Sequence, residues 1–192
     1  MAHPPGYTYD ESLDASPVSS EELDLLLATV LWTDDDGVAL RRAGELLTPR
    51  IDDILDLWYG FVGSHPHLVT YFDGPRGEPS PEYLAAVRLR FGRWISDLTT
   101  RDWDREWLNY QYEIARRHTD LMGRTDSIAT AHGHIALRYL IAFVVPITAT
   151  IRGFLAEGAG PDDDVDAMHQ AWFKAVTLTV TLWAQPYAPG RW

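Results

Sequence analysis

The segment DREWLNYQYEIARRH, residues 104–118, repeats apolar side chains at intervals of three and four positions. This spacing places them on one face of an α-helix, and Asp102 or Asp104 supplies an oxygen that caps the first turn. His118 lies on the same face. Soon after it, the sequence DLMGRTDSIATAHG (120–133) no longer follows the helical spacing. We therefore predict an amphipathic helix that ends at a histidine. Its inner face contains Trp107, Leu108, Gln111, Ile114 and Ala115.

Helical spacing recurs on both sides of this segment. A short helix is expected after Ser19 or Ser20, and two longer ones after Thr48 and Ser80, because each of these two hydroxyl residues precedes a proline that suits the first helical position. The later helices are expected at 134–157, with a kink at Pro146, and at 165–183. The sequence has neither strand-like alternation nor an internal repeat. The predicted fold class is all-α.

Composition limits the class of protein. A chain of 192 residues with 46% hydrophobic residues is expected to bury about 70% of its unfolded surface in one domain. No apolar run approaches the roughly 20 residues that span a bilayer, so no membrane association is expected. The net charge of −12 argues against a nucleic-acid partner, because phosphate binding needs a basic face. The absence of cysteine excludes disulfides, thiolate metal sites, cysteine nucleophiles and thioether attachment of haem.

The chain is expected to contain one folded domain. The first twenty residues lack a basic stretch followed by an apolar one, so they do not form a secretory signal, and a cytoplasmic location is expected. We expect residues 1–20 to be a flexible N-terminal arm, residues 21–187 a single domain and residues 188–192 a tail.

His118 is the first candidate site residue among the seven histidines. A helical histidine is more often a surface residue or a hydrogen-bonded core residue than a metal ligand. However, a single imidazole that faces an apolar interior at a helix end is also the pattern of a globin-type haem ligand. Tyr59 is the second candidate, because a buried phenol needs an acceptor, which is either a backbone carbonyl or an iron-bound gas. The large apolar residues Trp58, Phe91, Phe143 and Ile147 either line a flat ligand or simply form the core.

Other candidate sites are weaker. The two histidines of His-Gly-His (132–134) diverge on a helix, and the aspartates of 162–164 lack the spaced ligands of a calcium loop. No nucleophile elbow, zinc-protease motif, phosphate-binding loop or dinucleotide fingerprint occurs. No flavin or nicotinamide motif supplies electrons, so the sequence does not assign a dedicated enzyme.

Several longer blocks together resemble the protoglobins, single-domain haem proteins related to the sensor domains of globin-coupled sensors. The resemblance covers roughly residues 6–187, and the blocks occur in the family's order. They are DDILDLWYG (52–60), EYLAAVRLRFGRWI (82–95), DREWLNYQYEIARRH (104–118), LRYLIAFVVPITATI (137–151) and AWFKAV (171–176), followed by LWAQPY.

The resemblance implies a globin fold, a three-on-three helical sandwich, with an additional N-terminal helix and an arm that helps to bury the haem. His118 matches the proximal haem ligand. Trp58 and Tyr59 match the distal aromatic pair, with Tyr59 as the donor to bound ligand. Phe91, Phe143 and Ile147 match pocket-lining positions. Arg90 matches a basic residue that pairs with a haem propionate, although a solvated helix arginine is an equal alternative.

The functional expectation that follows is a haem b protein that binds O₂, CO or NO opposite His118, with latent chemistry towards peroxide or diazo reagents. The alternatives are a gas-sensing module that signals to a partner in trans and a haem-free helical scaffold. The family also forms homodimers through its last two helices and admits gas through narrow apolar tunnels. This sequence departs from the family at Thr99 and Thr100, near a position where a cysteine is common, and in the loop 119–134.

Overall fold

A computed structural model describes residues 4–7, 9, 12–74, 76–119, 134–188, 190 and 192. All regular elements in this part of the chain are helical, apart from an isolated bridge between Asp73 and Pro79. This confirms the predicted all-α fold class. The elements are α1 (Ser20–Thr29), α2 (Asp34–Leu47), η1 (Thr48–Arg50), α3 (Ile51–Gly63), α4 (Pro66–Val69), η2 (Thr70–Phe72), α5 (Pro81–Thr100), α6 (Arg105–Arg117), α7 (Leu137–Gly158), α8 (Val165–Ala184) and η3 (Gln185–Tyr187).

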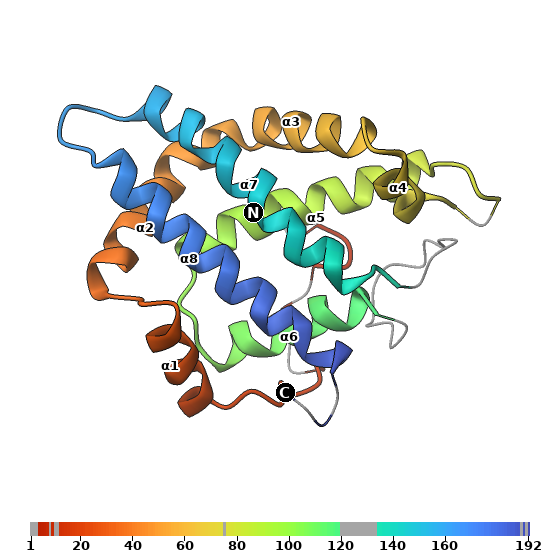
Figure 1. Ribbon diagram of the computed structural model, residues 1–192, viewed down its shortest axis with the longest axis horizontal. Helices are drawn as coiled ribbons and strands as arrows, with labels where there is room; N and C mark the ends of the chain where they lie inside the picture. The colour runs from red at the N-terminus through yellow and green to blue at the C-terminus, as the bar shows by residue number, and fades with distance from the viewer. Residues whose placement is uncertain are drawn as a thin grey trace.

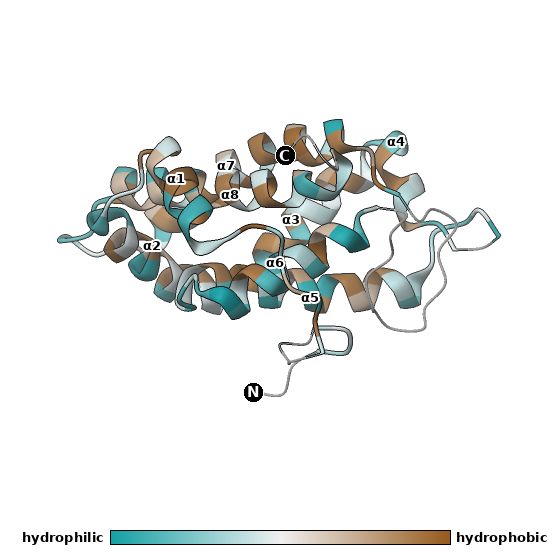
Figure 2. Cartoon of the chain, turned by 90° about the horizontal axis from the view of Figure 1, so that it is seen from below, coloured by the Kyte–Doolittle hydropathy of each residue, from teal (hydrophilic) through white to brown (hydrophobic). Residues whose placement is uncertain are grey.

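The helices form two layers (Figures 1 and 2). Helices α7 and α8 lie side by side in one layer, and α5 and α6 lie in the other (Figure 2). Helix α8 contacts α7 in its own layer and also contacts α2 and α6. The core between the layers is rich in indole rings, and Trp58, Trp107 and Trp172 are among its largest fully buried side chains.

The predicted helix starts are largely confirmed. Ser19 forms a capping box with Glu22 at the start of α1, Ser80 caps α5 and Asp104 caps α6. The start predicted at Thr48 is wrong, because Thr48 ends α2 and begins η1, and α3 begins at Ile51 without a side-chain cap. The long helix α7 is a second exception, because it begins at Leu137 and not at His134. The N–H of Ile135 donates to the carbonyl of His118 at 2.8 Å, so this stretch bonds to α6 and does not extend the helix. Helix α7 then continues through Pro146 to Gly158.

Helix α2 was not predicted from the sequence. Thr33 and Asp36 form a capping box at its start, and Leu40, Ala43 and Leu47 form its buried face. The carboxylate of Asp36 also forms an ion pair with Lys174 on α8, the single lysine of the chain, with 2.7 Å between Nζ and Oδ2. Helix α2 therefore joins the sandwich through both apolar and ionic contacts.

Residues before α1 pack against α6. Tyr7 and Val18 are buried, and Tyr7 lies 4.6 Å from Tyr110 between ring centroids. Arg105 on α6 donates to the backbone carbonyls of Ser16 and Val18. The helix that ends at His118 is thus covered by the N-terminal segment on this side.

Candidate functional site

His118 lies at the C-terminal cap of α6, partly buried. Its Nδ1 is 2.9 Å from the carbonyl oxygen of Ile114, which fits donation of the Nδ1 proton to that carbonyl. Burial lowers the pKa of His118 to about 4, so the imidazole is neutral near pH 7. Within the described part of the chain, no hydrogen bond reaches Nε2. A neutral imidazole with one nitrogen anchored has the other available as a metal ligand.

A continuous series of aromatic rings connects His118 to Trp58. The imidazole lies 5.1 Å from the indole of Trp183 between centroids, and Trp183 lies 5.8 Å from Trp94. Trp94 is 5.4 Å from Phe91, which in turn is 5.0 Å from Trp58. Four helices supply these rings: α3, α5, α8 and the end of α6. The fold therefore brings the predicted residues His118, Phe91 and Trp58 to one region.

A small cavity lies beside this series of rings. Its volume is about 40 Å³, and all of its lining side chains are apolar. Three predicted residues, Phe91, Phe143 and Ile147, line it, which brings together residues from α5 and α7. The full lining is Phe91, Trp94, Leu140, Phe143, Ile147, Val176, Val180 and Trp183.

Trp58 and Tyr59 behave differently, although they are neighbours on α3. The Trp58 indole is buried, and its Nε1 donates to Thr150 Oγ1 on α7 at 2.8 Å. The Tyr59 hydroxyl is buried with no hydrogen-bond partner among the described residues. Burial raises the pKa of Tyr59, so the phenol keeps its proton at neutral pH. Tyr59 does not line the cavity; its ring packs against Phe72 at 6.0 Å.

Arg90 precedes Phe91 on α5 and is partly buried. Burial raises the pKa of Tyr59, and the charges of Arg88 and Arg90 oppose this effect. Burial likewise raises the pKa of Tyr110 on α6, where Arg117 and Arg90 oppose it. The charge of Arg90 thus acts on two buried phenols, Tyr59 on α3 and Tyr110 on α6.

Several residues of the region were not predicted as site residues. Trp94 and Trp183 line the cavity and complete the series of rings. Gln111 is buried, and its Oε1 accepts a hydrogen bond from Trp183 Nε1 at 3.0 Å. The available signal was a polar Gln111 on an otherwise apolar helix face, since a buried amide needs a partner. Of the His-Gly-His segment, only His134 lies within the described residues.

The residues of this region fit a haem in their chemistry. Anchoring of Nδ1 on a backbone carbonyl is the usual arrangement of a metal-ligating histidine, and an apolar wall suits a macrocycle. The buried hydroxyl of Tyr59 is a donor in need of an acceptor. No group of three histidines or carboxylates that could hold a bare metal ion occurs among the described residues. Because pockets for ligands of this kind measure about 300–1,000 Å³, the aromatic side chains around the 40 Å³ cavity must separate when a haem enters.

Comparison with known proteins agrees with this chemistry. No curated protein matches the chain. Residues 19–191 match the sequence model of the Protoglobin family. Since the match covers most of the 192 residues, the chain belongs to the protoglobin family, whose members are haem globins that bind gases.

Proposed function

We propose that the protein is a b-type haem protein that reversibly binds O₂, CO or NO, with His118 as the proximal ligand. The observation that supports this best is the state of His118: neutral, fixed through Nδ1 and without a described partner at Nε2. When bound, the haem supplies an iron whose sixth position takes the gas. The protein's own side chains then decide how the iron is held and what surrounds the gas.

On the proximal side, the hydrogen bond from His118 Nδ1 to the Ile114 carbonyl sets the tautomer and the ring orientation. The flanking indole of Trp183 is itself fixed by its hydrogen bond to Gln111. The imidazole is therefore held by α6 and α8 together, and it presents Nε2 in its unprotonated form.

On the distal side, we assign Tyr59 as the hydrogen-bond donor to the bound gas. Its hydroxyl is protonated, buried and without a described acceptor, and iron-bound O₂ has the partial negative charge that such a donor stabilises. Trp58, held by Thr150, supplies bulk beside it. Phe91, Phe143 and Ile147 form an apolar wall that excludes water from the gas.

Arg90 is assigned to a haem propionate. Two observations support this assignment: Arg90 is partly buried, and its charge opposes the rise in the pKa of the two buried phenols Tyr59 and Tyr110. A guanidinium at the edge of an apolar pocket is suited to a bidentate bond with a carboxylate.

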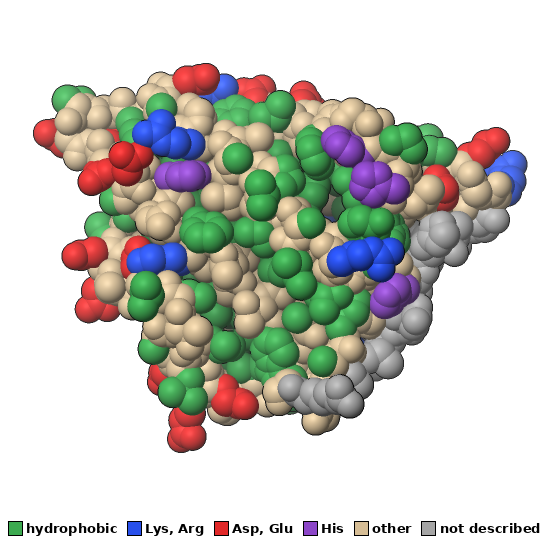
Figure 3. Space-filling view, in the orientation of Figure 1, with side chains coloured by type: hydrophobic (Ala, Val, Ile, Leu, Met, Phe, Trp, Pro, Cys, Tyr) green, Lys and Arg blue, Asp and Glu red, His purple; other side chains and the backbone are tan. Residues whose placement is uncertain are grey.

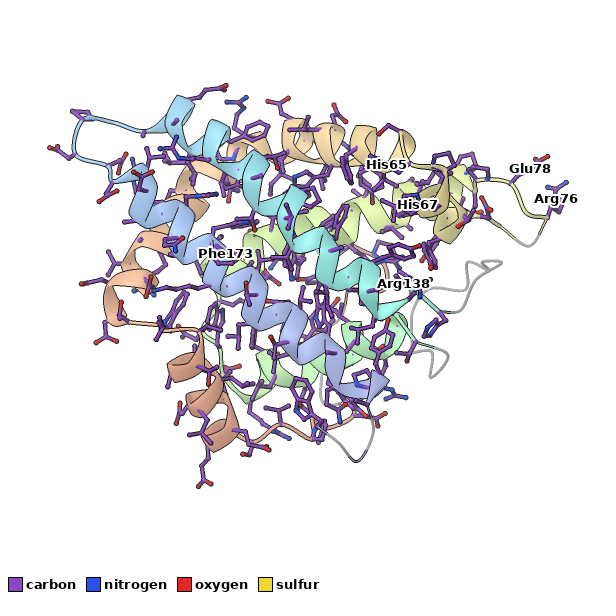
Figure 4. The ribbon with its side chains drawn as sticks, in the orientation of Figure 1. His65, His67, Arg76, Glu78, Arg138 and Phe173 are labelled. Carbon is purple, nitrogen blue, oxygen red and sulfur yellow. The ribbon has the colours of Figure 1, made fainter. Side chains whose placement is uncertain are left out.

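The exposed face of α7 and α8 supports a homodimer. Ile141 and Val145 on α7 and Phe173 on α8 are exposed by 55%, 69% and 41%. Figure 3 shows hydrophobic side chains across the middle of this face and acidic ones mostly towards its edges, and Figure 4 marks Phe173 on α8. Contrary to the expectation from the sequence, one helix among the described residues, α7, is long and apolar enough to cross a membrane, and 22% of its apolar window is buried; a single helix of this kind is weak evidence of a membrane span. Burial of this face between two copies accounts for its apolar character.

The deciding experiment is the absorption spectrum of the haem-reconstituted protein, ferric, ferrous and CO-bound, for the wild type and His118→Ala. We expect the wild type to take up one haem per chain and to give a five-coordinate ferrous spectrum, and the variant to lose the proximal-histidine signature. His67→Ala is the matched control, because His67 lies on α4, away from α6 (Figure 4). A wild type that takes up no haem, or a His118→Ala spectrum identical to that of the wild type, refutes the assignment.

A further inference from the structure

The hydroxyl of Tyr187 lies between two backbone carbonyls that belong to different parts of the chain. Tyr187 is the last residue of η3, which directly follows α8. Its Oη is 2.7 Å from the carbonyl oxygen of His118 and 2.6 Å from that of Ile135. The N–H of Ile135 donates to the same His118 carbonyl at 2.8 Å. The carbonyl oxygen of His118 therefore joins three segments: the end of α6, the residues just before α7 and the η3 turn after α8.

These contacts account for the polar atoms of His118 almost completely. Its N–H bonds to the carbonyl of Ala115, its carbonyl accepts from Ile135 and Tyr187, and its Nδ1 bonds to Ile114. Nε2 alone has no hydrogen bond among the described residues. Hydrogen bonds from Tyr187 and Ile135 thus fix the backbone of His118 to segments other than α6. Its Nε2 is the atom proposed to bind iron.

We infer that Tyr187 is a positioning residue for His118, acting through the His118 carbonyl; this inference rests on the proposed function. The last carbonyls of a helix have no partner within the helix, and the last turn frays when nothing else bonds them. His118 sits at such an end, immediately before the stretch that departs from helical spacing. The hydroxyl of Tyr187 holds this end against α8, and so it limits the tilt and rotation of the imidazole.

A purely structural role for Tyr187 makes a different prediction. The single proton of the hydroxyl is shared between the carbonyls of His118 and Ile135, so the hydroxyl could serve only to hold the C-terminal segment against the residues before α7. In that case its loss lowers the melting temperature and leaves the bond between His118 and iron unchanged. A positioning role requires the iron–histidine bond itself to change, which vibrational spectroscopy reports directly.

The test compares haem-loaded wild type with Tyr187→Phe, which removes a single oxygen atom and keeps the ring. Tyr139→Phe is the matched control, because Tyr139 lies near the start of α7 and its hydroxyl has no hydrogen bond among the described residues. Resonance Raman spectra of the ferrous proteins give the iron–histidine stretching band. Transfer of haem to an excess of haem-free myoglobin gives the rate of haem loss.

We expect Tyr187→Phe to shift and broaden the iron–histidine band and to lose haem about tenfold faster, the lower end of the effect seen when a partner of a metal ligand is removed. Tyr139→Phe should match the wild type in both measurements. An unchanged band in Tyr187→Phe overturns the inference, even if the melting temperature falls. Failure of the proposed function is distinguishable, because the wild type itself would then show no band that depends on His118.

Discussion

Trp58 and Thr150 are joined by a hydrogen bond from the indole Nε1 to the hydroxyl oxygen, 2.8 Å long. Thr150 Oγ1 donates its own proton to the carbonyl of Pro146, one turn earlier on α7, also at 2.8 Å. The proline therefore lies in the same turn as the residue that fixes Trp58. This bond connects α3 with α7 across the region proposed to hold the gas.

Thr150→Val should free the Trp58 indole. The variant keeps the shape of the side chain and leaves a buried N–H without an acceptor, which costs about 1–3 kcal/mol of unfolding free energy. Urea unfolding of the haem-free protein measures this loss. Thr181→Val is the control, because within the described part of the chain the Thr181 hydroxyl bonds only to the backbone of its own helix. If Thr150→Val and Thr181→Val lost the same unfolding free energy, the hydrogen bond between Trp58 and Thr150 would make no contribution of its own to stability.

Tyr59→Phe separates the two consequences of a buried hydroxyl. In the haem-free protein the hydroxyl is buried without a partner among the described residues, so its removal should raise the unfolding free energy, by about 1 kcal/mol. In the haem-loaded protein the same change removes the proposed donor and should speed O₂ dissociation about tenfold, equivalent to about 1.4 kcal/mol for a hydrogen bond to a charged acceptor.

CO provides the comparison for Tyr59→Phe, because iron-bound CO has much less negative charge to stabilise. Stopped-flow measurements of both gases on both proteins give the four rates required. An O₂ rate that changes no more than the CO rate would show that Tyr59 does not donate to the bound gas.

The stability of the haem-free protein should fall in mildly acidic solution because of His118. Burial lowers the pKa of His118 to about 4 in the folded chain, below an unfolded value of 6.5. Between these values the unfolded chain binds the extra proton, so the contribution is fully present above pH 6.5 and is lost as the pH falls towards 4. The full loss amounts to about 3 kcal/mol.

The measurement is chemical unfolding at pH 7, 6, 5 and 4.5 for the wild type and His118→Gln. Other groups titrate in the same range, so the difference between the two proteins is the quantity that tests His118. We expect the wild type to lose more stability on acidification than the variant. Parallel curves for the two proteins would place His118 in a solvated environment.

The helices with regular apolar spacing could be predicted from the sequence because the signal is local. The stripe on 104–118 and the cap at Asp104 determine where α6 lies and why His118 ends it. Helix α2 was missed because Gly37, Arg41 and Glu45 interrupt a short apolar pattern, and its burial depends on α8 and α5. The capping box of Thr33 and Asp36 was the readable sign of that helix.

The contacts around His118 could not be predicted from the sequence, because they depend on how the helices pack against one another. The spacing on 165–183 predicts the helix that contains Trp183, yet the contact of Trp183 with His118 follows from the packing of α8 on α6. The start of α7 was predicted three residues early, because the local sequence gives no sign that the N–H of Ile135 bonds to the His118 carbonyl and not within α7. Long-range hydrogen bonds of this kind are decided by tertiary structure.

Gly44 shows how closely the missed helix packs. A Cβ built at Gly44 on α2 would lie 2.4 Å from Thr99 Oγ1 and 2.6 Å from Thr99 Cβ on α5. Gly44→Ala should therefore force the two helices apart and lower the unfolding free energy by about 1–3 kcal/mol, despite the better helix propensity of alanine. Gly60→Ala on α3 is the matched control, because a Cβ at this position meets no atom of the described residues within 4 Å outside the neighbouring backbone of its own helix. That variant should be more stable than the wild type by up to about 1 kcal/mol. If thermal and urea unfolding gave both variants the same stability, the close approach of α2 to α5 at Thr99 would be wrong.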